Sequence, residues 1–445
     1  MSDPNNPNIN LPDTPQWALL QRELFWAPNE GKHPPFNTHP DKLRALAKER
    51  LSESGWLYAS SNAGLSWTHY ANRQAFYRHQ IVPRTLVDTN TRDTATRIFG
   101  HDAAAPIGFA PVGLNRIYHP TGELSPARVA GELGLPYCLS SAGSCSIEDV
   151  ATANDQAAAG NQPGKKEEAA ESGRGKAIRF YQLYWSPDNN VTLSMLERAA
   201  RNGYTALILT TDTWQLGWRH DDVARGNYAF YHEHGAGDLG LSDPAFLKSL
   251  SLEAKGDRGK EKQGEVGALW VDKHIWHGHA FSWDRLPWLM EQWRRISGGK
   301  PFCLKGVQSA ADARRAADLG VDAIVVSNHA GRQVDGAVGS LDALERIVDA
   351  VGERVCVMFD SGVRTGADVF KALALGAKFV FIGRLWVYGL GCAGEEGVRH
   401  VVKSLLAEFD ILMNVAGYPR VKDIDREALE SMPRGAYFPS TPELA

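Results

Sequence analysis

The sequence lacks the features that would assign it to a membrane, a secretory pathway or nucleic acid. It has no run of about 18 apolar residues, so it predicts no membrane-spanning helix. Its first residues, MSDPNNPNINLPDTPQW, contain neither a basic stretch nor an apolar core, and its last residues, PELA, are not a peroxisomal address, so we expect no targeting signal. The formal net charge of −4 gives no electrostatic basis for binding nucleic acid or an anionic membrane.

Cysteine is scarce, and so are metal-site and nucleotide-site patterns. The five cysteines are scattered, and an odd number without a secretory signal favours reduced thiols in a cytoplasmic protein. No two cysteines have metal-site spacing, and the histidines between residues 220 and 279 lack carboxylates or cysteines at ligand spacing, so we expect no metal. The pattern G-x-x-x-x-G-K-[ST] is absent, which excludes a P-loop.

What the sequence does contain is a repeating alternation of short apolar runs and helical patterns. With 43% hydrophobic and 22% charged residues over 445 positions, it has the composition of an ordinary globular protein. Helical patterns such as SAADARRAADLG lie between most of the runs and end in glycine. Eight such units predict a closed (β/α)8 TIM barrel of the α/β class rather than an open sheet. The eight runs are PIGFAP, PYCLSS, RFYQLY, ALILTT, PFCLKG, AIVVSN, VCVMFD and FVFIGR.

The predicted barrel takes up most of the chain, with extensions at both ends and two insertions. The Pro- and Asn-rich start and the amphipathic run DKLRALAKERL predict an N-terminal arm and helical extension packing on the barrel. One insertion is rich in small and charged residues and is expected to be a flexible surface segment. The other separates the fourth and fifth strands, exceeds an ordinary loop in length, and is predicted to be a lid. The predicted bounds are 1–105 for the extension, 106–425 for the barrel, 153–177 for the flexible insertion, 219–280 for the lid and 426–445 for a C-terminal tail.

Small, polar and charged residues stand where the eight runs end. In a (β/α)8 barrel, catalytic and binding groups lie at the carboxyl ends of the strands. A single Lys or Arg after a strand is usually a surface residue, but eight strands that all end this way indicate a shared site. The candidate site residues found there are Ala110, Pro111, Val112, Ser140, Gln182, Tyr184, Thr210, Asp212, Arg219, Lys305, Ser327, His329, Arg332, Asp360, Gly362, Arg364, Gly383 and Arg384.

The last two units contain a pattern typical of a phosphate site. DSGVRTG precedes a helical segment and GRLWVYG follows the eighth run, and glycine-rich turns at these places commonly bind phosphate in barrels. Arg364 and Arg384 can add charge-assisted hydrogen bonds to it. Lys305 can stabilise the negative charge that a flavin develops at N1 and O2 when it accepts a hydride. The side chains that can hydrogen-bond the ring are Ser140, Gln182 and Thr210, and the predicted cofactor is FMN.

A histidine with an acidic partner and two arginines complete the candidate site. His329 has an unperturbed pKa suited to proton transfer near neutrality, and Asp212 can hold its imidazole and stabilise the protonated form. Arg219 and Arg332 can clamp a carboxylate through paired hydrogen bonds. A base, a carboxylate clamp and a flavin-stabilising lysine together predict oxidation of a 2-hydroxy acid.

Six motifs carry a resemblance to a known family: SNHAGRQVDG, DSGVRTGADVFKALALGA, FIGR, YQLYW, LTTDTWQLGWR and NRQAF. From about residue 42 to 425, the chain resembles the FMN-dependent α-hydroxy-acid oxidase and dehydrogenase family, which includes glycolate oxidase, lactate oxidase and mandelate dehydrogenase. LGWR, VYGL and the long segment after the fourth strand are most similar to lactate 2-monooxygenase-like members. The family resemblance implies a homo-tetramer or octamer.

The resemblance also implies a role for each candidate residue. His329 is similar to the family's base and Asp212 to its partner. The substrate carboxylate would meet Arg332, Arg219 and Tyr58, the last of which lies in GWLYASSNAG, and Tyr184 would bond the substrate hydroxyl. The positions matching flavin-ring and ribityl contacts are Ala110, Val112, Ser140, Gln182, Thr210 and Lys305, and those matching ribityl and phosphate contacts are Asp360, Gly362, Arg364, Gly383 and Arg384.

Four positions depart from the family pattern. Ala330 follows the base where the family usually has glycine, and Ser361 replaces the first glycine of the common DGGVR. Trp214 stands where a proline is usual, and Ala142 stands where glycolate oxidase-like members have a tryptophan near the substrate side chain. These departures bear on which hydroxy acid is used more than on the chemistry.

Several functions fit these observations. The first is oxidation of an L-2-hydroxy acid with dioxygen, releasing hydrogen peroxide or, if the oxo acid stays with the peroxide, decarboxylating it. The second is a dehydrogenase that passes electrons to another carrier. A non-redox FMN barrel and a scaffold without activity are further alternatives, against which the arginines and His329 argue.

Overall fold

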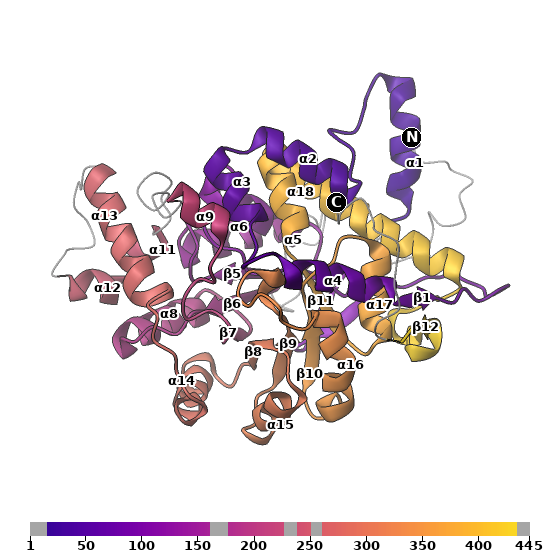
Figure 1. Cartoon of the computed structure of the whole chain (residues 1–445). Helices are drawn as coiled ribbons and strands as arrows, with labels where there is room; N and C mark the ends of the chain where they lie inside the picture. Colours follow the sequence, from indigo (N-terminus) through magenta and orange to yellow (C-terminus); the bar gives the residue numbers. More distant parts are fainter. Residues whose placement is uncertain (1–15, 161–176, 227–237, 251–259, 434–445) are drawn as a thin grey trace.

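The computed structural model describes residues 16–160, 177–226, 238–250 and 260–433. Eight parallel strands close into a barrel in the order β10-β11-β4-β5-β6-β7-β8-β9 (Figure 1). Each strand coincides with one of the eight apolar runs, so the predicted TIM barrel is confirmed. The strands are Ile107–Phe109 (β4), Tyr137–Ser140 (β5), Arg179–Leu183 (β6), Leu207–Thr210 (β7), Phe302–Val307 (β8), Ala323–Val326 (β9), Cys356–Phe359 (β10) and Phe379–Ile382 (β11).

Alternate residues of the strands fill the inside of the barrel, and the others face the surrounding helices. In β6, for example, Phe180 lies in the inner cluster while Tyr181 belongs to the outer one. Gly108 leaves room for Phe379, because a Cβ on the glycine would lie 2.6 Å from the phenylalanine ring. The inner cluster is apolar and includes Ala110, Cys138, Phe180, Ile208, Cys303, Ala323, Val325, Met358, Phe379 and Phe381.

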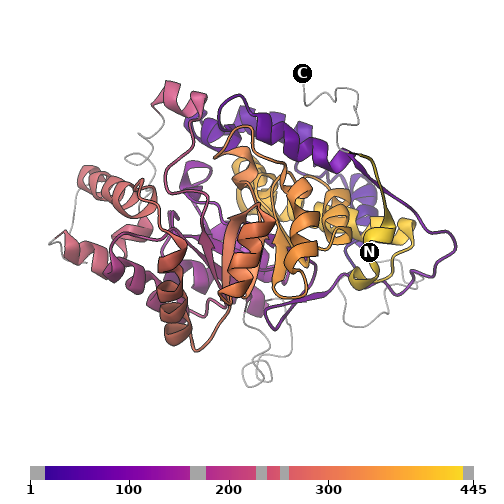
Figure 2. The same cartoon turned by 60° about the horizontal axis from the view of Figure 1, so that its bottom comes forward.

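Helices surround the strands and bury their apolar faces against them. Those between residues 310 and 375 lie side by side around one flank, as Figure 2 shows in orange. Side chains cap the starts of two of them: Ser309 accepts from the Ala311 and Asp312 amides, and Thr365 with Asp368 forms a capping box. The barrel helices are Leu124–Glu132 (α5), Ile147–Gly160 (α6), Asn189–Arg201 (α8), Leu286–Ser297 (α14), Ala310–Asp318 (α15), Ser340–Val351 (α16), Gly366–Ala374 (α17) and Arg384–Ala416 (α18).

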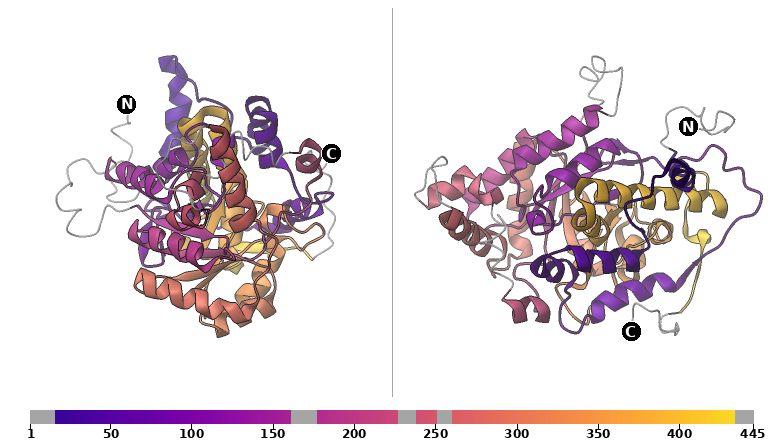
Figure 3. Two further views of the ribbon diagram at one scale, coloured as in Figure 1. Left: turned by 90° about the vertical axis from the view of Figure 1, so that its left-hand side faces the viewer. Right: turned by 90° about the horizontal axis from the view of Figure 1, so that it is seen from above.

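The N-terminal helices pack on the barrel. Its helices are α1 (Leu19–Trp26), α2 (Pro40–Arg50), α3 (Glu53–Ser60) and α4 (Trp67–Tyr77). Helices α1 and α2 lie against the long helix α18, which is seen from above in the right panel of Figure 3. Helix α4 is tied to the barrel by Arg73, whose guanidinium donates to the Gly362 carbonyl at 2.6 Å and to Asp368 at 2.8 Å.

Two short sheets complete the extension. The hairpin of β2 (Thr96–Ile98) and β3 (His101–Ala103) closes the amino-terminal end of the barrel, because its Ile98 and Ala103 join the inner apolar cluster. Strand β1 (His79–Ile81) pairs with β12 (Leu429–Ser431). Part of the predicted C-terminal tail is therefore an ordered strand.

The two predicted insertions differ in part from expectation. Interpreting residues 153–177 as a flexible loop is wrong at its start, because 153–160 continue helix α6 with Ala153 and Asn154 buried. Residues 161–176 lie outside the described residues. The described part of segment 219–280 consists of α9 (His220–Arg225), α11 (Asp238–Leu241), α12 (Pro244–Ser249), α13 (Lys260–Trp270) and the π-helix η5 (Val271–Ile275).

The described helices of segment 219–280 pack beside the barrel. Helix α12 contacts α8, and α11 contacts α13, to the left in Figure 1. Residues 227–237 and 251–259 of the predicted lid lie outside the described residues. In the described part of the chain, no helix is long and apolar enough to cross a membrane.

Candidate functional site

A cavity lies at the carboxyl ends of the barrel strands, with an empty volume of about 880 Å³ that includes the solvent-filled space at its mouth. Most of the residues predicted from the strand ends meet there, although they come from segments spread over the whole chain. The predicted residues that line it are Tyr58, Ala110, Pro111, Val112, Ser140, Tyr184, Lys305, His329, Arg332, Asp360, Gly362, Arg364, Gly383 and Arg384. Five others lie one layer behind this lining: Gln182, Thr210, Asp212, Arg219 and Ser327.

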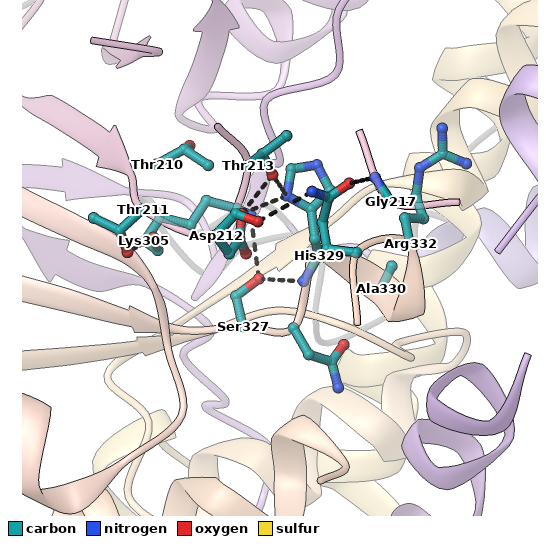
Figure 4. Close-up of polar contacts among 12 residues, drawn as sticks. Thr210, Thr211, Asp212, Thr213, Gly217, Lys305, Ser327, His329, Ala330 and Arg332 are labelled. Atoms are coloured by element: carbon teal, nitrogen blue, oxygen red, sulfur yellow. Dashed lines mark hydrogen bonds and ion pairs between the residues drawn. The ribbon is translucent and has the colours of Figure 1, made fainter. Parts of the chain in front are cut away.

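His329 and Asp212 form the centre of the site. Figure 4 shows the imidazole turned toward Asp212 and Thr213, with Nδ1 2.8 Å from the Asp212 Oδ1 atom and 3.0 Å from the Thr213 hydroxyl. The Thr213 hydroxyl donates to the same carboxylate oxygen at 2.7 Å, so Nδ1 is the imidazole nitrogen that donates to Asp212. This leaves the Nε2 atom as an acceptor. The His329 side chain is 20% exposed and lines the cavity, so Nε2 can be reached by a bound molecule.

The charge states of this pair suit proton abstraction. Burial lowers the pKa of the His329 imidazole below its ordinary value, while Asp212 opposes that shift. Burial alone would raise the pKa of Asp212, but His329 and Lys305 together lower it to about 2. Near neutral pH the histidine is therefore an uncharged base and the aspartate is ionised beside it.

The backbone that carries His329 is a tight turn after strand β9. His329 and Ala330 both have positive φ, +55° and +58°, a left-handed conformation that residues with a Cβ adopt at a cost. Gly331 has φ +78°, and a Cβ there would lie 2.6 Å from the His69 amide nitrogen. The Asn328 side chain accepts from the Gly331 amide at 3.1 Å and closes the turn. The turn is thus set by local backbone geometry as well as by side chains.

Lys305 brings a buried cation to the same cavity. Its Nζ atom donates to the Ser327 hydroxyl at 3.1 Å and lies 3.5 Å from Asp360. Burial would lower the pKa of Lys305, but Asp360 and Asp212 outweigh it and raise that pKa. The lysine therefore stays charged and can stabilise an anion that forms in front of it.

A chain of hydrogen bonds runs behind the lining on the opposite strands. The Ser140 hydroxyl donates to Gln182 at 2.9 Å, and the Gln182 amide donates to the Thr210 hydroxyl at 2.9 Å. All three side chains are buried. The three residues proposed as ring contacts are adjacent, and their polar atoms bond one another.

The two arginines of the predicted carboxylate clamp have different places. Arg332 lines the cavity, donates to the Ser61 carbonyl at 2.8 Å, and lies 5.1 Å from the centre of the Tyr58 ring. Arg219 does not line it among the described residues; its Nε donates to the Arg332 carbonyl at 3.1 Å. Burial and the nearby Arg332 lower the pKa of Arg219 to about 10. Arg219 thus holds the backbone of Arg332 and adds positive charge behind it.

The ends of strands β10 and β11 bring glycine backbone and the side chains of Arg364 and Arg384 to the cavity. Gly362 has φ +88°, and a Cβ on Gly383 would meet nothing closer than 3.9 Å, so backbone amides can be approached closely there. Arg384 donates to carbonyl and amide oxygens, including the Ala59 carbonyl at 3.0 Å. Burial and three neighbouring arginines, among them Arg364, lower the pKa of Arg384 to about 9.

The cavity therefore fits FMN. A phosphate beside Arg364 and Arg384 would offset the crowding of positive charge, and Lys305 would face the part of the ring that becomes negative on reduction.

Several residues that line or border the cavity were not among the predicted site residues. Tyr118 lines the cavity and stacks on Tyr58 with ring centres 6.2 Å apart, and Trp276 lines it and packs edge-on against Tyr184 at 6.4 Å. Both come from irregular segments after helices, where strand-end reasoning does not look. Thr213 and Ser361, by contrast, adjoin predicted residues, and a search for hydroxyls beside Asp212 and Asp360 could have found them.

Comparisons with known proteins agree with this geometry. Residues 47–431 match the model of a family described as FMN-dependent dehydrogenase. The chain is 42% identical to the FMN-dependent alpha-hydroxy acid dehydrogenase qulF of Penicillium citrinum, covering 90% of this chain and 92% of the relative. It is 36% identical to the L-lactate oxidase of Lysinibacillus sphaericus, covering 86% and 90%. A crystal structure of mandelate oxidase with benzoyl-formic acid superimposes with a TM-score of 0.70 at 29% identity, covering 89% of this chain and 99% of the other.

Proposed function

Because the chain belongs to the FMN-dependent dehydrogenase family and is an FMN-dependent α-hydroxy-acid-oxidising enzyme, we propose that it oxidises an L-2-hydroxy acid to the 2-oxo acid with dioxygen as electron acceptor. The observation that carries this proposal is the His329–Asp212 pair at 2.8 Å, with Arg332 and Lys305 on the same cavity. The cavity thus brings together a neutral base, His329, a cation that can bind a carboxylate, Arg332, and a cation that can stabilise a reduced flavin ring, Lys305.

The cofactor supplies the redox step and the protein supplies its surroundings. When bound, FMN would supply the acceptor for the two electrons that leave the α-carbon of the hydroxy acid. Lys305 would stand beside the ring, and its raised pKa keeps it charged there. The residues that would hold the phosphate and ribityl chain are Asp360, Gly362, Arg364, Gly383 and Arg384.

His329 removes the proton in this proposal. Its Nδ1 is committed to Asp212, so Nε2 accepts the proton from the substrate. The resulting imidazolium lies 2.8 Å from an ionised carboxylate whose pKa is about 2, which stabilises it. Asp212 therefore fixes the tautomer and balances the charge without itself taking up the proton.

Arg332 and Tyr58 would bind the substrate carboxylate. Arg332 is anchored through the Ser61 carbonyl on one side, and Arg219 holds its backbone from behind. A planar guanidinium fixed in this way can meet a carboxylate with two parallel hydrogen bonds. Tyr184 also lines the cavity and is proposed to bond the hydroxyl group of the substrate.

The substrate side chain would lie against Ala142, Tyr118 and Trp276, which all line the cavity. The alanine leaves open a wall that a larger side chain would fill, and the two aromatic rings provide apolar surface. We therefore propose a hydroxy acid with an apolar side chain larger than that of glycolate. A panel from glycolate to mandelate tests this, with Ala142→Trp as the matched variant: the variant should lose the large substrates and keep the small ones.

The electron acceptor separates the proposal from its alternative, a dehydrogenase that uses another carrier. The names of the L-lactate oxidase and mandelate oxidase relatives support dioxygen, and that of the Penicillium citrinum relative supports a dehydrogenase. We expect the purified holoenzyme to consume dioxygen and release one hydrogen peroxide per oxo acid. Coupled decarboxylation would instead yield a shortened acid without peroxide. Turnover with an artificial acceptor and none with dioxygen would overturn the proposal in favour of the dehydrogenase.

A further inference from the structure

Ser361 lines the cavity and has an unusual backbone conformation. It follows strand β10 and is 6% exposed, and its φ is +87°, the left-handed side of the backbone map where glycine is favoured. Gly362 beside it has φ +88°. A serine in a conformation that favours glycine indicates that its hydroxyl has a function that offsets the strain.

The hydroxyl of Ser361 joins two parts of the site. It accepts from the Ala330 amide at 3.0 Å and from the Asn328 amide at 3.4 Å. It donates to Asp360 Oδ1 at 2.7 Å, while Oδ2 of the same carboxylate lies 3.5 Å from the Lys305 ammonium. One side chain therefore links the turn that carries His329 to the ion pair beside Lys305.

The turn that Ser361 touches needs support. His329 and Ala330 are two consecutive residues with a Cβ at positive φ, and both are strained. Arg384 donates to the Ala330 carbonyl at 3.2 Å, and Asn328 accepts from the Gly331 amide. The Ser361 hydroxyl accepts from the backbone amide of Ala330, the residue that directly follows the base.

We propose that Ser361 is a positioning residue for His329: its hydroxyl keeps the strained Ala330 amide in place and ties the base-carrying turn to the Lys305–Asp360 pair. The proposal rests on the role of His329 as base in the proposed function. The hydroxyl touches no substrate atom in this account, so Ser361 acts through the turn. Losing it should change how fast the proton is removed more than how tightly the hydroxy acid binds.

Two substitutions separate the hydroxyl from the strain. Ser361→Gly removes the hydroxyl and relieves the backbone, so thermal unfolding should stay the same or move upward. Ser361→Ala removes the hydroxyl and keeps the strain, so unfolding should move downward. Both should slow anaerobic flavin reduction by about 3- to 10-fold, the effect of one hydrogen bond, with little change in KM.

Hydrogen exchange gives a readout that does not depend on turnover. In the protein stripped of FMN, the peptide covering residues 327–333 should exchange several-fold faster in both variants than in the wild type. The matched control is Ser125→Ala, a buried serine on α5 whose hydroxyl lies 2.7 Å from Thr121. This control should leave both the exchange of that peptide and the rate of flavin reduction unchanged.

Ala330→Gly tests the coupling. Glycine removes the strain that the hydroxyl offsets, so Ser361→Gly should slow flavin reduction less in the Ala330→Gly background than in the wild type. Additive effects, or a Ser361→Gly protein with wild-type exchange and wild-type flavin reduction, would overturn the proposal. If the wild type is not reduced by any 2-hydroxy acid, the proposed function fails, while exchange in the stripped protein still decides whether Ser361 holds the turn.

Discussion

The two ends of the barrel differ in polarity: the amino-terminal end is apolar and the carboxyl end is lined by charged and polar side chains. The amino-terminal end is closed by the β2–β3 hairpin, whose Ile98 and Ala103 join an apolar cluster with Phe180 and Ile208. The carboxyl end surrounds the cavity with buried Lys305, Arg219 and Arg384. The apolar amino-terminal end stabilises the folded state by burying apolar surface. The carboxyl end instead places charged side chains where a ligand can bind.

Strained backbone is more frequent at the carboxyl end. Of the described residues with a Cβ and positive φ, His329, Ala330 and Ser361 lie in turns after strands there, whereas Phe99, with φ +50°, lies in the turn of the β2–β3 hairpin. Burying several positive charges close together and holding strained turns both cost stability, and such costs concentrate at functional sites. We infer that the closed end and the outer helices stabilise a mouth that is itself strained. Substitutions at the carboxyl end should therefore reduce activity, and substitutions at the amino-terminal end should reduce stability.

The largest expected effect is on catalysis at the mouth. His329→Gln removes the proposed base but keeps the size and polarity of the side chain, so turnover should fall by about 10²- to 10⁴-fold. Thermal unfolding and FMN content should stay near those of the wild type. His400→Gln, on helix α18, is the matched control and should keep full activity. If both variants lost turnover equally, the loss in His329→Gln could not be assigned to removal of the base.

The next effect is on stability at the closed end. Phe180 is fully buried in the inner cluster, so Phe180→Ala should lower the free energy of unfolding by about 3–5 kcal/mol. Denaturant unfolding measures this loss. The folded fraction should keep the kcat of the wild type, and a kcat reduced more than tenfold at low temperature would contradict the separation of the two ends.

A smaller effect is expected on cofactor binding. Arg384→Met removes a charged donor next to the proposed phosphate site, so the dissociation constant of FMN should rise by about 10- to 100-fold. Flavin fluorescence during equilibrium dialysis measures it. Arg399→Met is a suitable control, since Arg399 pairs with Glu132 and Glu395 on the outside of the barrel. If Arg384→Met binds FMN as tightly as the wild type, Arg384 does not contribute to a phosphate site.

The smallest effect is a shift of the pH profile. The pKa of His329 is lowered by burial, and the neutral form is the active one, so kcat/KM should rise with pH through a value below the ordinary histidine pKa and then level off. Asp212 raises the pKa of His329, so Asp212→Asn should move this rise to lower pH and lower the plateau. A rise that moves to higher pH in the variant would contradict the pairing.

The same comparison explains what the sequence could predict. Eight buried parallel strands leave continuous apolar runs, so the barrel and the residues at its carboxyl end were accessible from the sequence, including His329, Asp212 and Lys305. Trp276 and Tyr118 reach the cavity only through tertiary packing, and no local pattern marks them. The continuation of α6 to Gly160 was missed because small and charged residues resemble those of a loop.

The account's central claim is that the charged mouth binds FMN and lets a 2-hydroxy acid reduce it. The most direct measurement is an anaerobic titration of the purified yellow protein with L-2-hydroxy acids, followed by the flavin absorbance. We predict that the absorbance is lost with at least one apolar L-2-hydroxy acid in the wild type and that His329→Gln stays yellow. A protein that takes up no FMN, or one whose flavin is reduced equally fast without His329, would contradict the claim.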